Sequence, residues 1–159
     1  MNKKIGTNAT NAGLSQVSAS VEWSGREELS VILQIDSLGT VQSANVRGVG
    51  GPKFLKQLVQ FRSEINGQKI SELKYPEGID PEHICFREAI LKLQQAWTFP
   101  YQEEELCHCR AVLTATVDQA ICMGAHTTKK VSRVTSASTA CGTCRPNVDA
   151  IIKFRLGKK

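Results

Sequence analysis

Four of the six cysteines in this 159-residue chain lie in its C-terminal third, in two short pairs. Cys107-His108-Cys109 is a C-x-C pair, and Cys141-Gly142-Thr143-Cys144 is a C-x-x-C pair. Iron-sulfur clusters and tetrahedral zinc both prefer such soft thiolate ligands, and short spacers let each pair hold one side of the centre. The spacing predicts a four-thiolate metal site, in which a [2Fe-2S] cluster would place one iron on each pair. A structural zinc ion is the alternative.

The residues between the two pairs predict short helices that would hold them in place. A helix is expected over residues 113–123, with Thr114 or Thr116 at its start, one apolar face and a stop at Gly124. Cys122 falls off that face and is expected to be a free thiol. His108, between two ligands, is expected to be a solvent-facing spacer, with tuning or replacement of a ligand as the alternative.

Two further helices are expected toward the end of the chain. Thr127 or Thr128 can cap the first, and Val131 with Val134 gives it an apolar edge. Pro146 fits the first turn of the second, where the missing N–H donor is not needed. The free backbone N–H groups of that turn are expected to point toward negatively charged sulfur.

Taken together, residues 107–152 resemble the [2Fe-2S] domain of bacterioferritin-associated ferredoxin (BFD), which also occurs in the middle of NifU proteins. The resemblance rests on the two cysteine pairs, on Gly124-Ala125, and on Thr135, Ala137, Thr139 and Pro146. It implies a small all-α domain of helix-turn-helix units in which Cys107, Cys109, Cys141 and Cys144 all bind the cluster. The family usually has glycine where this chain has Ser136, Ser138 and Ala140, so the loop is expected to approach the cluster differently.

The charge of the chain is unevenly distributed along the sequence. Residues 106–159 contain 9 Lys and Arg against 2 Asp and Glu, whereas residues 1–105 contain 11 against 13. Arg110, Arg133 and Arg145 are expected to offset the negative charge of a thiolate-bound cluster. Phe154 is the only aromatic residue from 106 onward, which argues against a nucleic-acid surface. No apolar run approaches the length of a membrane helix.

The first hundred residues predict an α+β domain with a small antiparallel sheet. Residues 29–35 and 40–47 have the pattern of a hairpin around the turn 36–39. A helix is expected to follow Pro52, with an apolar stripe that ends before Asn66-Gly67 and contains Leu55, Leu58, Val59, Arg62 and Ile65. A longer helix is expected to begin at Asp80-Pro81 and to continue through Trp97.

Residues 8–97 are similar, more weakly, to the IscU-type scaffold domain at the start of NifU. The similarity rests on residues 8–13, Gly39, Ala44, Gly50, and Cys85 with Ala89 and Leu93. Two of that family's three cysteine positions hold Gly25 and Gly51 here, and its histidine position holds Ile84. The resemblance therefore implies a degenerate scaffold that does not assemble a cluster. Cys85 is expected to be a buried apolar residue, with a persulfide acceptor as the alternative.

These observations predict two domains, residues 1–100 and residues 104–159, in a NifU-like protein that is not an enzyme. The expected role is accessory, in iron-sulfur cluster assembly, with a cysteine desulfurase among the partners. The alternative is an electron carrier for another oxidoreductase or an iron-storage protein. Residues 2–7 are basic with no apolar run after them, so a cytoplasmic location is expected. An exposed hairpin edge makes a homodimer reasonable, and neither nucleic acid nor a membrane is expected as a partner.

Overall fold

The computed structural model describes residues 13–23 and 25–157. Contacts between Cα atoms divide the chain into two compact units, one of Met1–Glu77 with Cys85–Trp97 and one of Gly78–Ile84 with Thr98–Lys159. The segment 8–12, used above for the IscU-type resemblance, lies outside the described residues. No helix among the described residues is long and apolar enough to span a membrane.

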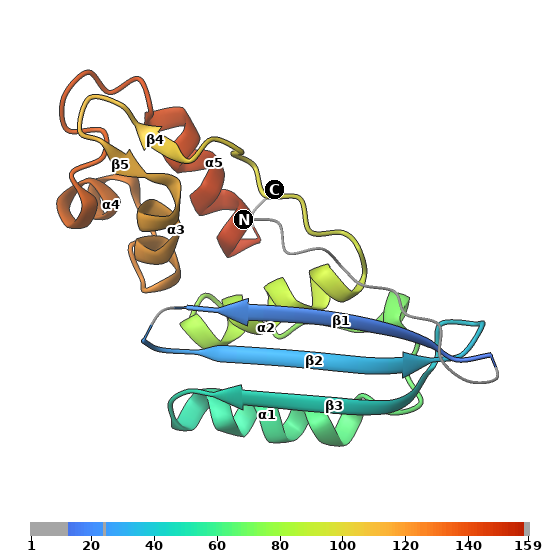
Figure 1. Ribbon diagram of the computed structural model, residues 1–159. Coiled ribbons are helices and arrows are strands. Elements are labelled where there is room, and N and C mark those ends of the chain that lie inside the picture. The colour runs from blue at the N-terminus through green and yellow to red at the C-terminus, as the bar shows by residue number, and fades with distance from the viewer. Residues whose placement is uncertain (1–12, 24, 158–159) are drawn as a thin grey trace. The chain divides into compact units, whose positions relative to one another are not determined.

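The first unit is built on a three-stranded antiparallel sheet in the order β1-β2-β3. Its strands are β1 (Ser15–Glu22), β2 (Glu28–Ile35) and β3 (Val41–Val49). Alternate residues of β1 and β2 are buried, as expected for a sheet with one covered face. Helices α1 (Pro52–Glu64) and α2 (Pro81–Leu93) lie along one side of this sheet (Figure 1). The predicted hairpin is therefore present, and β1 is a strand that the sequence analysis missed.

The predicted apolar stripe of α1 is only partly correct. Leu58 is 3% exposed and Ile65 is 1% exposed, but Leu55 and Val59 face solvent. Phe54 and Phe61 are buried in their place, and both rings contact the ring of Phe86 with centroids 5.5 Å apart. The aromatic pairs with α2 thus set the rotation of α1, because large rings bury more apolar surface than Leu55 and Val59 would.

Helix α2 is shorter than predicted. It begins at Pro81 as expected but ends at Leu93, and Gln95 adopts a left-handed conformation with φ 58°. The backbone N–H of Ala96 donates to the carbonyl of Leu91, a hydrogen bond typical of a helix C-terminus. Ala96 and Trp97 therefore lie beyond the helix and do not extend its buried face.

The described part of the second unit has three helices of its own. It also has a small β-hairpin, which the sequence analysis did not predict. Strands β4 (Glu105–Cys107) and β5 (Val112–Leu113) pair antiparallel and lead into α3 (Thr114–Cys122). Helices α4 (Thr128–Thr135) and α5 (Arg145–Leu156) complete the unit. The expected all-α domain is thus predominantly helical, with a β-hairpin added at its start.

Three local signals for the ends of these helices are confirmed. Gly124, with φ 105°, follows the end of α3. The Thr127 side chain caps α4 by accepting a hydrogen bond from the backbone N–H of Lys130, at 3.2 Å. Pro146 lies in the first turn of α5. The expected apolar edge of α4 is only partly correct, because Val131 is fully buried but Val134 is 67% exposed. The expected off-face position of Cys122 was wrong, because Cys122 is fully buried.

Candidate metal centre

Two loops bring the four predicted cysteine ligands to the same end of the second unit. Cys107 ends β4, and the backbone N–H of Arg110 donates to the Cys107 carbonyl at 3.2 Å, closing a turn that carries Cys109. Cys141 and Cys144 lie on the loop between α4 and α5, with Cys144 at the N-cap of α5. All four are free thiols, with no disulfide among them.

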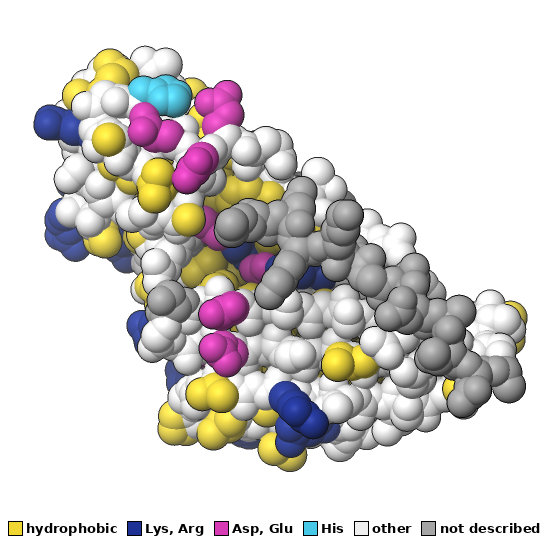
Figure 2. Space-filling model, in the orientation of Figure 1, with side chains coloured by type: hydrophobic (Ala, Val, Ile, Leu, Met, Phe, Trp, Pro, Cys, Tyr) yellow, Lys and Arg dark blue, Asp and Glu magenta, His cyan; other side chains and the backbone are white. Residues whose placement is uncertain are grey.

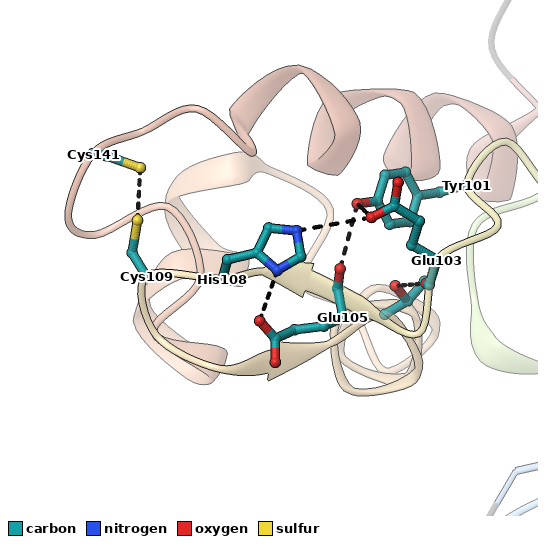
Figure 3. A network of polar contacts seen from close by, with 7 residues as sticks. Tyr101, Glu103, Glu105, His108, Cys109 and Cys141 are labelled. Carbon is teal, nitrogen blue, oxygen red and sulfur yellow. Dashed lines mark hydrogen bonds and ion pairs between the residues drawn. The ribbon is translucent and has the colours of Figure 1, made fainter.

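The four thiols differ sharply in their exposure to solvent. Cys107 is 2% exposed and Cys144 is 6% exposed, whereas Cys109 and Cys141 are exposed. The Sγ atoms of Cys109 and Cys141 lie 2.9 Å apart, facing each other across the two loops (Figure 3). The structure thus brings an exposed cysteine of one pair against an exposed cysteine of the other.

This close contact makes the two exposed thiols electrostatically unequal. Hydrogen bonds lower the pKa of Cys141 to about 7. The one with Cys109 has the largest effect, and the one with the Thr143 side chain has the next largest. The same contact with Cys141 raises the pKa of Cys109. Either sulfur can be the donor of this hydrogen bond. Because thiolate is the form that binds metal, this pair is already partly prepared as a ligand.

A left-handed loop carries the second pair toward the first. Ser136 and Ser138 have φ angles of 66° and 64°, in the region that glycine adopts most easily. These are two of the three positions where the BFD resemblance led us to expect glycine, and serine adopts the left-handed conformation at both. The Cys144 thiol donates to the Ser138 hydroxyl, with 3.5 Å between sulfur and oxygen, and the hydroxyl would become the donor once that sulfur is ionised.

Arg110, one of the three expected arginines, makes a hydrogen bond beside the centre. Its Nε donates to the Thr139 hydroxyl at 3.1 Å, which ties the loop of Cys109 to the loop that leads into Cys141. A cation held there by a hydrogen bond favours thiolate over thiol nearby. Arg133 and Arg145 are exposed.

His108 is turned toward carboxylates, as Figure 3 shows. Its Nδ1 lies 2.8 Å from Glu105 Oε1, its Nε2 lies 3.8 Å from Glu103 Oε2, and its side chain is 70% exposed. Acidic side chains gather around a histidine on the visible surface of the second unit (Figure 2). The expectation of a solvent-facing spacer is confirmed, and the sequence analysis did not foresee the two glutamates that hold the ring.

Tyr101 is a further residue of this centre that the sequence analysis missed. Its hydroxyl lies 3.4 Å from Glu103 Oε2 and 3.4 Å from the Glu105 carbonyl. Burial away from water is the largest cause that raises the pKa of Tyr101. The negative charge of Glu103 is the next largest, and that of Cys144 has a smaller effect in the same direction. A single tyrosine upstream of the cysteines carried no spacing signal, because only the fold places it near Cys144.

The sulfur positions test which inorganic group the residues fit. Around one tetrahedral metal with bonds of about 2.3 Å, all four sulfurs would lie about 3.8 Å from one another. Among the described residues, no three cysteine sulfurs lie within 4.8 Å of one another. The four sulfurs are therefore not gathered as closely as a single tetrahedral zinc ion requires, while the Cys109 and Cys141 sulfurs are in contact.

A second group of ligand-type side chains lies at the start of α2. Asp80, Glu82 and His83 each place one ligand atom within 4.8 Å of the others. They offer oxygen and nitrogen only, and the first turn of a helix attracts carboxylates without any cation. This group has no part in the thiolate centre.

Comparison with known protein families identifies the C-terminal region. Residues 106–153 match the family described as the BFD-like [2Fe-2S] binding domain. Searches of curated proteins and of solved structures returned no match for this chain. The family match begins at Leu106 and covers all four candidate cysteines. The chain thus carries a BFD-like [2Fe-2S]-binding domain at residues 106–153, and its cofactor is a [2Fe-2S] cluster.

Proposed function

We propose that this protein is a one-electron carrier whose cluster is held by Cys107, Cys109, Cys141 and Cys144. The observation that carries the proposal is the division of the four thiols into two buried and two exposed ones. When bound, a [2Fe-2S] cluster takes up and releases one electron. Two buried ligands would anchor it, and two exposed ligands would leave one edge open to a redox partner.

The chain supplies a setting that stabilises negative charge at the proposed cluster site. Cys144 occupies the N-cap of α5, where unpaired backbone N–H groups and the helix dipole favour an anion. Arg110 adds a cation that the Thr139 hydroxyl holds in place. Both features support reversible uptake of an electron, because reduction adds one negative charge to the centre. We propose a carrier rather than an enzyme.

Redox cycling of the purified protein tests the carrier function. Protein purified without oxygen is reduced with dithionite and then mixed with oxidised cytochrome c as a one-electron acceptor. A carrier recovers its full visible spectrum after reoxidation and does so through repeated cycles. Bleaching in the first cycle, or a cluster that dithionite cannot reduce, would contradict the proposal.

A second candidate function is an accessory role in iron-sulfur cluster assembly. The first unit supports it, since a three-stranded antiparallel sheet precedes two helices in the order expected of a scaffold domain of the IscU type. Cys85 is the only cysteine among residues 1–105 and is fully buried. A single buried thiol supports docking rather than cluster building in this unit.

Binding to a purified cysteine desulfurase separates the two candidates. The accessory role predicts a complex detectable by calorimetry, with the same affinity for Cys85→Ala as for the unchanged protein. If no complex forms while redox cycling succeeds, the assembly role is excluded and the carrier role stands.

A further inference from the structure

We infer that Asp80, Glu82 and His83, at the start of α2, bind a divalent transition-metal ion separately from the thiolate centre. Each of the three residues places one ligand atom within 4.8 Å of the others. The group offers one imidazole nitrogen and two carboxylates, a mixed set that suits ions such as Mn²⁺, Fe²⁺ and Zn²⁺. The inference depends neither on the cluster nor on the proposed carrier function.

The carboxylate of Glu82 is the first observation that points to a ligand. Glu82 is 9% exposed, and its carboxylate is directed into the group. Among the described residues, this carboxylate has neither a hydrogen bond nor an ion pair. Withdrawing a carboxylate from water without a partner is costly, and buried charges in proteins are paired or coordinate metals. A cation at this position would provide the missing counter-charge.

A buried ring nitrogen of His83 also lacks a partner. Nδ1 is shielded from solvent and makes no hydrogen bond in the described structure. It lies 3.8 Å from Asp80 Oδ2, which is too far for a hydrogen bond. Two ligands on one ion with bonds of about 2.1 Å lie about 3.0–3.4 Å apart. A small closing of the gap between His83 and Asp80 would therefore let both reach the same ion.

Gly78 explains how the imidazole ring reaches this position. Its φ is 141°, and a Cβ atom on it would lie 2.4 Å from His83 Nδ1. Only a residue without a side chain therefore lets the ring lie against the loop that precedes α2. The close approach holds the ring beside the carboxylates, which lowers the cost of ordering the ligands when a metal binds.

Helix capping does not account for the two carboxylates. A capping carboxylate accepts a hydrogen bond from a backbone N–H of the first turn. Within the described part of the chain, neither Asp80 nor Glu82 accepts one. The positive end of the α2 dipole opposes a cation, but the two negative charges offset it. Three protein ligands leave further coordination positions to water, so we expect exchangeable rather than permanent binding.

Binding of Mn²⁺ to the full chain, purified without oxygen, tests the inference. Mn²⁺ prefers oxygen and nitrogen to thiolate, so it reports on this group rather than on the cysteines. The EPR signal of free Mn²⁺ gives the stoichiometry, and electron spin-echo spectra detect ¹⁴N coupling from a bound imidazole. We expect one Mn²⁺ per chain, with ¹⁴N coupling, in the unaltered protein. His83→Gln should lose the coupling, and Glu82→Gln should weaken binding about 10-fold or more.

Glu77→Gln is the matched control. It removes an exposed carboxylate three residues before Asp80 but outside the group, so it should leave the affinity for Mn²⁺ unchanged. Equal weakening in Glu77→Gln and Glu82→Gln would mean that diffuse surface charge attracts the ion, and would overturn the inference. The unaltered protein would overturn it without any variant, by showing no saturable binding or a bound Mn²⁺ without ¹⁴N coupling. Coupling that survives in His83→Gln would also overturn it, because another histidine would then be the ligand.

Discussion

The hydroxyl of Ser138 lies 3.5 Å from the sulfur of Cys144, at the buried side of the metal centre. Ser138 is 6% exposed, so water does not readily replace this contact. Hydrogen bonds to ligand sulfur stabilise the more negative, reduced form of an iron-sulfur cluster. We therefore expect this serine, at a position where the BFD resemblance led us to expect glycine, to raise the reduction potential of a cluster bound by Cys144.

Replacing Ser138 with alanine should lower the reduction potential. The change removes the hydroxyl but keeps the Cβ atom and its left-handed backbone. A loss of about 1 kcal/mol in the reduced state corresponds to roughly 40 mV for a one-electron couple. Protein-film voltammetry measures the shift. Ser136→Ala is the matched control, because Ser136 lies in the same φ region but the sulfur contact belongs to Ser138, and it should leave the potential unchanged. Equal shifts in both variants would contradict the assigned role of Ser138.

Replacing Ser136 with glycine should stabilise the protein. Ser136 follows α4 in a left-handed conformation, φ 66°, which raises the energy of a residue with a Cβ atom by about 1 kcal/mol. Anaerobic urea unfolding of the holoprotein measures the gain. Ser132→Gly, inside the same helix, should instead lower the stability by about 1 kcal/mol. A loss of stability in both variants would show that the left-handed turn stores no strain.

The contact between Asp118 and Arg155 should be essential to the packing of α3 against α5. Arg155 Nε donates to Asp118 Oδ1 at 2.6 Å, and the Arg155 side chain is 5% exposed. Asp118→Asn should lower the free energy of unfolding by about 3 kcal/mol, because it leaves a buried guanidinium without its counter-charge. The double variant with Arg155→Met should recover most of that loss in the same unfolding assay. A single variant that unfolds within about 0.5 kcal/mol of the unchanged protein would mean that the pair acts as a surface salt bridge.

Asp36 should make the first unit sensitive to acid. Its carboxylate accepts a hydrogen bond from the backbone N–H of Thr40, and further ones from Leu38 and Gln42, which lower its pKa. The stabilisation is therefore fully present above the ordinary pKa of about 3.9 and is lost as the pH falls through the lower pKa of the folded state. Urea unfolding between pH 5 and pH 2, expressed as the difference from Asp36→Asn, should show this loss. A difference that does not change with pH would contradict it.

Local chemistry made several elements predictable from the sequence. A capping threonine, a glycine after α3 and a proline in the first turn of α5 act over one or two turns, so Thr127, Gly124 and Pro146 could be placed without knowledge of the fold. The rotation of α1 about its own axis could not be predicted in this way. Leu55 and Val59 satisfy the helical period as well as Phe54 and Phe61 do, and only the contact with Phe86 on α2 decides between them. Strand β1 was missed although its buried residues Val17, Ala19 and Val21 alternate with polar ones, which is the pattern of a strand with one covered face.

The metal centre, too, could be predicted only in part from the sequence. The spacing of the cysteines predicted a four-thiolate site, and the family match supplies the cluster type. The contact between Cys109 and Cys141 depends on turns at both loops and on the left-handed residues Ser136 and Ser138. Those conformations are set by tertiary packing. The sequence could therefore indicate which cysteines form the site, but not which two sulfur atoms are in contact. The assignment of all four cysteines as ligands stays a prediction.

Analysis of iron and acid-labile sulfide in anaerobically purified protein, alongside single cysteine variants, tests the account most directly. The unchanged chain, Cys85→Ala and Cys122→Ala should each contain two irons and two sulfides per chain, with the visible bands of a [2Fe-2S] cluster. Cys107→Ala and Cys144→Ala should lose most of both. Zinc without visible bands in the unchanged protein, or bleaching by Cys85→Ala with full retention in Cys144→Ala, would contradict the account.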